Sequence, residues 1–142
     1  MIPKRIVLDT NICLDLFVFC DPRWNALLAA LESGAVQAVT RADCRTEWIR
    51  VLDYPHLPLD DHSRAQAMSR FDALIPVVPS EPAGTAPLPL CKDPDDQKFL
   101  ELARDAGAAQ LITKDKALLK LARKTARAGM FEILPPERWQ AE

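Results

Sequence analysis

Short apolar runs alternate along this chain with longer segments of helical periodicity, and this alternation restricts the fold more than any other feature. Apolar runs of strand length occur over residues 5–8, 35–39, 109–112 and 131–134. Apolar residues at helical spacing occur over residues 24–33, 41–52, 60–74, 93–105 and 116–128. A weak further strand is expected over 75–78, where Pro76 removes a backbone donor. The pattern predicts an α/β fold, in which a mostly parallel sheet carries helices on both faces.

The composition is typical of a globular domain rather than of a disordered or membrane-spanning chain. The chain has 142 residues, of which 49% are hydrophobic, and its formal net charge is -2, so we predict one domain over 1–142. The apolar stretch from Ile12 to Cys20 contains Asp15 and is far shorter than the ~20 residues that cross a bilayer. It also lacks the features of a secretory signal. We therefore expect a cytoplasmic protein without membrane contact.

The cysteines and the proline-rich segment are interpreted as structural features. Cys13, Cys20, Cys44 and Cys91 are scattered and form no C-x-x-C pair, which predicts neither a zinc site nor a disulfide framework. We expect all of them to be buried as small apolar side chains. The segment 79–89 is rich in proline and has no periodicity, so it is predicted to be a surface loop.

Acidic residues stand at the ends of separate predicted elements. Two of them directly follow strands, three open the helix over 93–105, and one lies about a turn into the helix over 41–52. Ligands of open parallel sheets bind beyond the carboxyl ends of the strands, where the N-termini of helices also point. We expect this edge of the sheet to gather the acids Asp9, Glu47, Asp93, Asp95, Asp96 and Asp115.

Carboxylates that gather at one edge repel each other. Two of them ~5 Å apart repel by roughly 3 kcal/mol at an effective dielectric constant of about 20. A divalent cation such as Mg²⁺ removes this conflict, because it takes oxygen ligands, keeps several waters and completes its shell with substrate phosphate. The same ion activates water and stabilises the leaving oxygen of a phosphodiester. The pattern therefore indicates metal-dependent phosphodiester hydrolysis.

Each acid also has a simpler structural interpretation, and the residues alone leave both interpretations open. Asp9, Asp93 and Asp115 are well placed to cap the helices that follow them. Asp96 would then interact only with the helix dipole, and Glu47 would be an ordinary exposed helix residue.

Three blocks of the sequence resemble the signature blocks of PIN-domain proteins. They are Ile6-Val7-Leu8-Asp9-Thr10-Asn11, the segment from Asp93 to Ala103, and the segment from Leu111 to Leu119. The middle block is the most specific, and the likeness extends in block order and spacing over nearly the whole chain. The chain most resembles the toxin components of toxin–antitoxin systems, which are relatives of the VapC-like ribonucleases. The resemblance implies a single Rossmann-like three-layer domain, dependence on Mg²⁺ or Mn²⁺, and endonucleolytic cleavage of RNA.

The resemblance also assigns roles to individual residues. Matched position by position, the catalytic residues and metal ligands are Asp9, Glu47, Asp96 and Asp115. Asn11 and Thr113 match polar positions that hold the carboxylates by hydrogen bonds, and Asp93 is close enough to act from outside the ligand set. The family often has a second acid where this chain has Ala117, so Asp115 is expected to be the only ligand from its loop.

The spacing of basic residues and the resemblance together indicate partners. An RNA strand would follow a basic stripe on the helix over 116–128 through phosphate contacts, although a solvated helix face is the simpler alternative. The residues of this basic stripe are Lys116, Lys120, Arg123, Lys124 and Arg127. A cognate antitoxin would block the acidic site, for instance with an arginine or lysine among the carboxylates. The family likeness further implies a homodimer, formed through the region 60–74 or through apolar residues near Trp24.

Two other functions compete with the nuclease. A haloacid-dehalogenase-like phosphatase also has an aspartate after its first strand, but it needs a second aspartate where this chain has Asn11. A non-catalytic interaction module would use the acids to bind a structural ion or a basic partner protein. Both the nuclease and the module bind metal, but only the nuclease turns over RNA.

Overall fold

Four parallel strands form the centre of the computed structural model, which describes residues 3–79 and 86–141. Their order in the sheet is β2-β1-β3-β4, and each neighbouring pair is parallel. The strands are β1 Lys4–Leu8, β2 Val36–Ala38, β3 Gln110–Ile112 and β4 Glu132–Leu134. The sheet confirms the α/β fold, and it confirms the stronger strand predictions to within one residue at each end.

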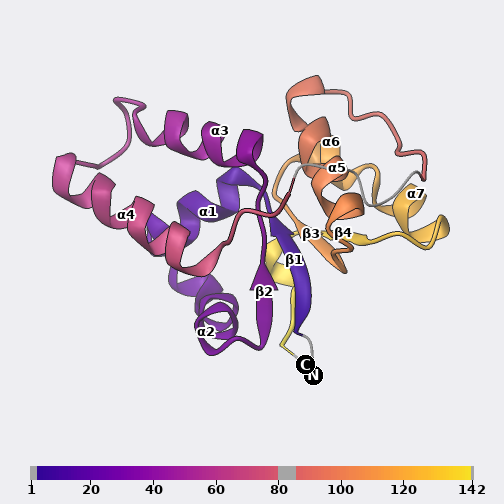
Figure 1. Ribbon diagram of the computed structural model, residues 1–142, viewed down its shortest axis with the longest axis horizontal. Coiled ribbons are helices and arrows are strands. Elements are labelled where there is room, and N and C mark those ends of the chain that lie inside the picture. Colours follow the sequence, from indigo (N-terminus) through magenta and orange to yellow (C-terminus); the bar gives the residue numbers. More distant parts are fainter. Residues whose placement is uncertain (1–2, 80–85, 142) are drawn as a thin grey trace.

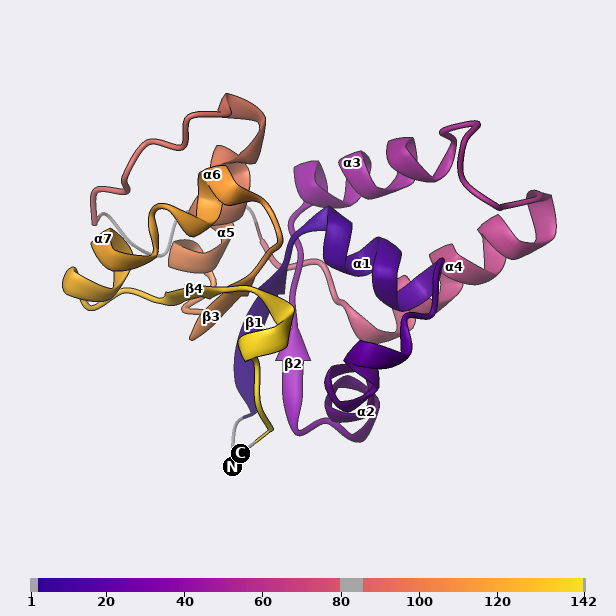
Figure 2. The same ribbon diagram turned by 180° about the vertical axis from the view of Figure 1, so that it is seen from behind.

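Helices connect the strands and cover both faces of the sheet (Figure 1). The α-helices are α1 Thr10–Phe17, α2 Asn25–Ser33, α3 Ala42–Leu52, α4 Asp61–Leu74, α5 Gln97–Asp105, α6 Lys116–Leu119 and α7 Ala122–Arg127. The short 3-10 helices are η1 Pro22–Trp24, η2 Pro94–Asp96 and η3 Pro136–Arg138. Figures 1 and 2 show α1 to α4 on one side of β1, and α5 to α7 on the other. The observed layers are those that the alternating sequence pattern predicts.

Two hydrophobic cores lie on the two faces of the sheet. Side chains alternate across β1, so Ile6 belongs to the core beneath α1, α2 and α4, whereas Val7 belongs to the core beneath α5 and α6. In the first core, the rings of Trp48 and Phe71 are stacked with their centroids 5.0 Å apart, and Phe17 packs edge-on against both. This aromatic cluster joins α1, α3 and α4, and it thereby fixes the helix on which Glu47 lies.

Local sequence explains where α2 and α4 end and begin. Oδ1 of Asp60 accepts the N–H of Ser63 at 2.7 Å, and the Ser63 hydroxyl accepts the N–H of Asp60 at 2.9 Å, which together form a capping box. Gly34 ends α2 with a φ of 80°, a left-handed conformation that glycine adopts without steric cost. The sequence predicted the end of α2 at Gly34, whereas it predicted α4 from its apolar spacing and not from the capping box.

The helix predicted over 116–128 is instead two helices, α6 and α7. The N–H of Leu121 donates to the carbonyl of Leu118 at 2.9 Å, and this tight turn interrupts the α-helical hydrogen bonding. Leu118, Leu121 and Thr125 are all buried. The turn therefore lets both short helices direct side chains into the core.

The structure bears differently on three further predictions: one strand is reduced, one burial is wrong, and one loop is only partly described. The weak strand over 75–78 is reduced to an isolated parallel bridge between Thr40 and Val77 in the described chain. Cys20 is exposed, so its predicted burial is wrong, and its φ of 50° shows that the chain turns sharply there after α1. In the predicted loop over 79–89, residues 80–85 lie outside the described residues, and 86–89 have no regular structure.

The remaining cysteines agree with the sequence. Cys13, Cys44 and Cys91 are buried, and none of the cysteines is in a disulfide. Among the described residues, no helix combines the length and the apolar character needed to cross a membrane.

Candidate active site

The backbone hydrogen bonds of the sheet continue one residue past β1 and β3, and they bring two candidate residues together. The N–H of Asp9 donates to the carbonyl of Ile112 at 3.0 Å, and the N–H of Thr113 donates to the carbonyl of Leu134 at 3.1 Å. The hydroxyl of Thr113 in turn donates to Oδ2 of Asp9 at 2.7 Å. Asp9 is only 5% exposed, and Thr113 is fully buried. The first predicted ligand is thus held at the end of the central strand.

Asp115 belongs to the same polar cluster. Its N–H donates to Oγ1 of Thr113 at 2.9 Å, so Thr113 supports both this acid and Asp9. Its own Oδ1 accepts the N–H of Ala117 at 2.8 Å and caps α6. Oδ1 of Asp9 likewise accepts the N–H of Thr10 and caps α1. The capping interpretation of these two acids is therefore correct, and the same positions also bring their charges together.

Glu47 reaches the cluster from α3. The hydroxyl of Thr10 donates to its Oε2, and Nζ of Lys98 donates to its Oε1 at 2.8 Å. Lys98 also donates to the backbone carbonyl of Asp95. The side chains of Lys98 and Glu47 are 17% and 15% exposed. Burial lowers the pKa of Lys98, but the hydrogen bond and the charge of Glu47 outweigh it and raise the pKa, so the ammonium group stays charged.

Asp96 shows how closely the acids approach each other. Burial, a hydrogen bond with Asp115 and the negative charges of Asp9 and Asp115 raise its pKa from 3.8 to about 8. Oδ2 of Asp96 is buried and has no hydrogen-bond partner among the described residues. A carboxylate in this position lacks the donors that would normally stabilise its charge.

The pKa of Asp9 rises for similar reasons. Burial raises it from 3.8 to about 6, the hydrogen bonds from Thr113 and Thr10 oppose the rise, and the charges of Glu47 and Asp115 add to it. The charges of residues 9, 47, 96 and 115 thus act on one another although they come from four separate segments of the chain. Asp9 is therefore close enough to Glu47, Asp96 and Asp115 for their charges to interact.

A family model of the PIN domain matches residues 5–117. This chain belongs to the PIN domain family. The matched range contains all four converging acids and ends before α7 and β4. PIN domains are typically nucleases and generally use divalent metals. No curated protein matches the chain.

The acids of this PIN domain fit a divalent cation in their chemistry. All four candidates offer carboxylate oxygens, which Mg²⁺ and Mn²⁺ prefer. Oδ2 of Asp96 is buried and has no hydrogen-bond partner among the described residues, and a cation would offset the repulsion that adds to the effect of burial on the pKa of Asp9 and Asp96. However, no three acidic, histidine or cysteine side chains of the described chain are already grouped as a metal-binding set. Carboxylate oxygens of Asp9 and Glu47 instead accept hydrogen bonds from Thr113, Thr10 and Lys98.

The structure changes the expected supporting residues. Thr113 supports the acids as expected, but the second supporting side chain is Thr10 rather than Asn11, whose Oδ1 is buried without a partner among the described residues. Asp93 is exposed and caps η2 through the N–H of Asp95, while its charge adds to the rise in the pKa of Asp96. Lys98, for which the sequence pattern predicts no role, lies one turn after Asp95 and pairs with Glu47.

A second contact joins the segments that follow β1 and β3. Nζ of Lys114 lies 2.7 Å from Oδ2 of Asp15, and Nε1 of Trp24 donates to the same oxygen at 3.1 Å. Asp15 is a buried residue of α1. The loop that holds Thr113 and Asp115 is therefore attached to α1 at two places.

The predicted basic stripe is exposed but divided. Its members on or beside α6 are Lys116 and Lys120, and those on α7 are Arg123, Lys124 and Arg127. Figures 1 and 2 both place α7 farther from α3 than α6 is. Lys116 and Lys120 are consequently the members best placed to meet a strand that leaves the acids, and their contact with RNA stays a prediction.

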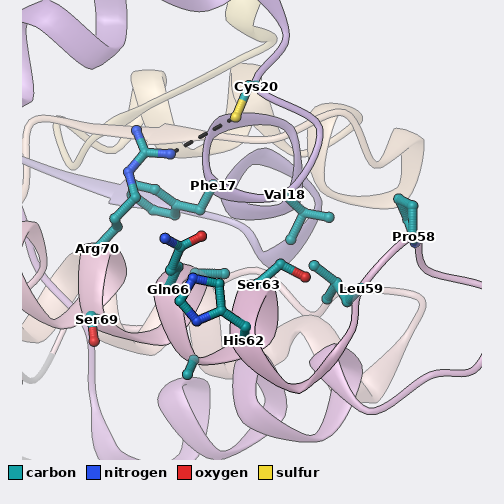
Figure 3. Close-up of a pocket in the computed structure, with 12 residues that line it drawn as sticks. Phe17, Val18, Cys20, Pro58, Leu59, His62, Ser63, Gln66, Ser69 and Arg70 are labelled. Atoms are coloured by element: carbon teal, nitrogen blue, oxygen red, sulfur yellow. Dashed lines mark hydrogen bonds between the residues drawn. The ribbon is translucent and has the colours of Figure 1, made fainter.

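A groove of about 550 Å³ lies between α1 and α4, and none of the four acids lines it (Figure 3). Phe17, Val18 and Leu59 form apolar parts of its wall. Arg70 lies over the ring of Phe17, 5.6 Å from its centroid, and donates to Sγ of Cys20 at 3.8 Å. The groove includes part of the region over 60–74 that was expected to form an interface.

Proposed function

We propose that this PIN domain is a Mg²⁺- or Mn²⁺-dependent endoribonuclease. The observation that supports this most is a set of carboxylates at one edge of the sheet, where burial together with the neighbouring negative charges raises the pKa of Asp9 to about 6 and of Asp96 to about 8. Perturbed carboxyl groups of this kind cluster at functional sites. A purely structural role would leave their repulsion uncompensated, whereas a divalent cation and a phosphodiester substrate make use of it.

The residues of the chain would share the work in hydrolysis. Asp9, Glu47, Asp96 and Asp115 would hold the cation, which when bound supplies Lewis-acid stabilisation of the phosphate charge and activates a water molecule. Thr113 fixes the orientation of Asp9 through Oδ2, and Thr10 does the same for Glu47 through Oε2. Hydrolysis adds water across the P–O bond and, by analogy with the family, leaves a 5′ phosphate and a 3′ hydroxyl.

Incubation with single-stranded RNA and Mn²⁺ tests this proposal. We expect cleavage by the wild type, loss of cleavage with a chelator, and a large loss in the Asp9→Asn variant. Asp61→Asn is a matched control, because that side chain is fully exposed on α4 and outside the acidic cluster. Cleavage that survives the chelator, or that is equal in Asp9→Asn and the wild type, would contradict the proposal.

We further propose that the domain is the toxin of a type II toxin–antitoxin system. This rests on the likeness of its sequence blocks to such toxins, and on an acidic site that a cationic residue of an antitoxin would neutralise. Expression of the wild type should arrest growth, expression of Asp9→Asn should not, and the adjacent open reading frame should restore growth. Arrest by both forms would show that toxicity does not come from the acidic site.

A homodimer is proposed as the working assembly, with the region over 60–74 as its interface. The groove between α1 and α4 supports this placement, because the apolar side chains of Phe17, Val18 and Leu59 line it beside that region. Sedimentation at several protein concentrations measures the assembly. A monomer at all concentrations would rule it out.

A non-catalytic interaction module remains the second candidate. The ion pair between Lys98 and Glu47 favours it, because one of the proposed ligands already has a cationic partner. The module and the nuclease both predict metal binding that depends on Asp9. Turnover of RNA under the conditions above separates them.

A further inference from the structure

Lys98 forms an ion pair with a carboxylate that the proposed metal would need. Its Nζ donates to Oε1 of Glu47 at 2.8 Å, while the hydroxyl of Thr10 donates to Oε2. Both oxygens of Glu47 therefore have hydrogen-bond partners already. Lys98 is also held by the carbonyl of Asp95, in the 3-10 turn that carries Asp96. The ammonium group of Lys98 thus links α3, which carries Glu47, to η2, which carries Asp96.

This ion pair differs from an ordinary surface pair. Exposed pairs contribute little because water and salt screen them, but the side chains of Lys98 and Glu47 are only 17% and 15% exposed. Removal of one partner of a largely buried pair leaves the other charge poorly compensated. A divalent ion that recruits Glu47 must therefore displace Lys98 or share the carboxylate with it.

We propose that Lys98 is a built-in competitor of the divalent cation for Glu47. This inference rests on the proposed function. Lys98 is a positioning residue that keeps Glu47 engaged until the ion displaces its ammonium group. Asp9, Asp96 and Asp115 would then hold the ion before Glu47 joins them.

Binding of Mn²⁺ alone, measured without RNA by electron paramagnetic resonance of the free ion, tests the inference. Lys98→Met and Lys98→Gln should each tighten Mn²⁺ binding by about 10-fold, which is ~1.4 kcal/mol. Lys98→Arg retains the cation and should bind Mn²⁺ within about twofold of the wild type. Lys92→Met is the matched control, because it removes the same charge from an exposed site before η2, and it should change the affinity by less than about twofold.

A double-mutant cycle with Glu47→Gln separates competition from simple charge repulsion. If Lys98 acts through Glu47, Lys98→Met should leave the Mn²⁺ affinity of the Glu47→Gln protein unchanged. Equal tightening in both backgrounds would show that Lys98 only repels the ion, and it would overturn the inference. Unchanged or weaker binding in Lys98→Met and Lys98→Gln, with folding verified by circular dichroism, would overturn it as well.

Asp9→Asn keeps this test distinct from a test of the proposed function. Loss of Mn²⁺ binding in Asp9→Asn supports the metal site whatever the Lys98 variants show. Mn²⁺ binding that is unaffected by Asp9→Asn would contradict the metal site itself, and the inference about Lys98 would fail with it.

Discussion

The metal-free protein should become less stable as the pH rises, and Asp9→Asn should remove much of this loss. Asp9 is 5% exposed, and its pKa in the folded protein is raised from 3.8 to about 6. A raised carboxyl pKa means that the folded state holds the proton more tightly than the unfolded state does. The charge on Asp9 therefore destabilises the fold, and the substitution removes that charge while keeping an acceptor oxygen for the N–H of Thr10.

The size and the pH window follow from the two pKa values. Below a pH of about 3.8, Asp9 is protonated in both states and contributes nothing to the pH dependence. Between 3.8 and about 6 the unfolded state loses its proton first, so stability falls, and above about 6 the full cost remains. At about 1.4 kcal/mol per pH unit this cost is roughly 3 kcal/mol. Asp96, whose pKa rises to about 8, extends the decline to higher pH.

Urea unfolding in the presence of a chelator at several pH values between about 4 and 8 measures the effect. The stability of Asp9→Asn minus that of the wild type should grow by roughly 3 kcal/mol across this range. Asp61→Asn should show no such trend, because its carboxylate is fully exposed. Saturating Mg²⁺ should reduce the pH dependence of the wild type, since the ion balances the charge. A difference between Asp9→Asn and the wild type that is independent of pH would refute this reasoning.

Three further substitutions test separate parts of the structure. Thr113→Val leaves Oδ2 of Asp9 and the N–H of Asp115 without their partner, so unfolding experiments should show a loss of about 1–3 kcal/mol that Thr113→Ser largely restores. Phe71→Ala opens a cavity beside the stacked ring of Trp48 and should lower the free energy of unfolding by about 3–5 kcal/mol in urea titrations. Glu47→Gln should reduce RNA cleavage by at least about 100-fold, corresponding to ~2.7 kcal/mol of transition-state stabilisation, whereas Glu32→Gln on the exposed face of α2 should leave the rate unchanged.

The order of the strands and the helices after Trp24 could be predicted because they are local properties of the chain, whereas α1 Thr10–Phe17 was not predicted. The alternation of apolar runs and helical periodicity specifies a parallel sheet, and a residue that directly follows a parallel strand must lie at its carboxyl edge. Asp9 and Asp115 are of this kind. For Glu47 and Asp96 the topology predicted only a position near that edge, and the family resemblance assigned them as ligands, since a position on a helix does not by itself show which way a side chain points.

Other features depend on contacts that leave no local pattern. Lys98 and Glu47 are 51 residues apart in the sequence, and a lysine on an amphipathic helix is usually solvated. Thr10 and Glu47 are 37 residues apart, so no local pattern indicates the contact between them. The turn between α6 and α7 allows Leu121 and Thr125 to be buried. The helical spacing of apolar residues continues across this turn, so the sequence does not indicate it.

The two attachments between α1 and the segment after β3 bear on how the molecule accommodates a substrate. Thr113 and Lys114 are consecutive residues, and they contact Asp9 and Asp15 respectively. The loop after β3 and the start of α1 therefore cannot rotate independently. Asp9 and Asp115 should therefore keep a constant spacing while the side chain of Glu47 and the η2 turn adjust around them. Relaxation-dispersion NMR would then find millisecond exchange at residues 47 and 96, and little at residues 9 and 113.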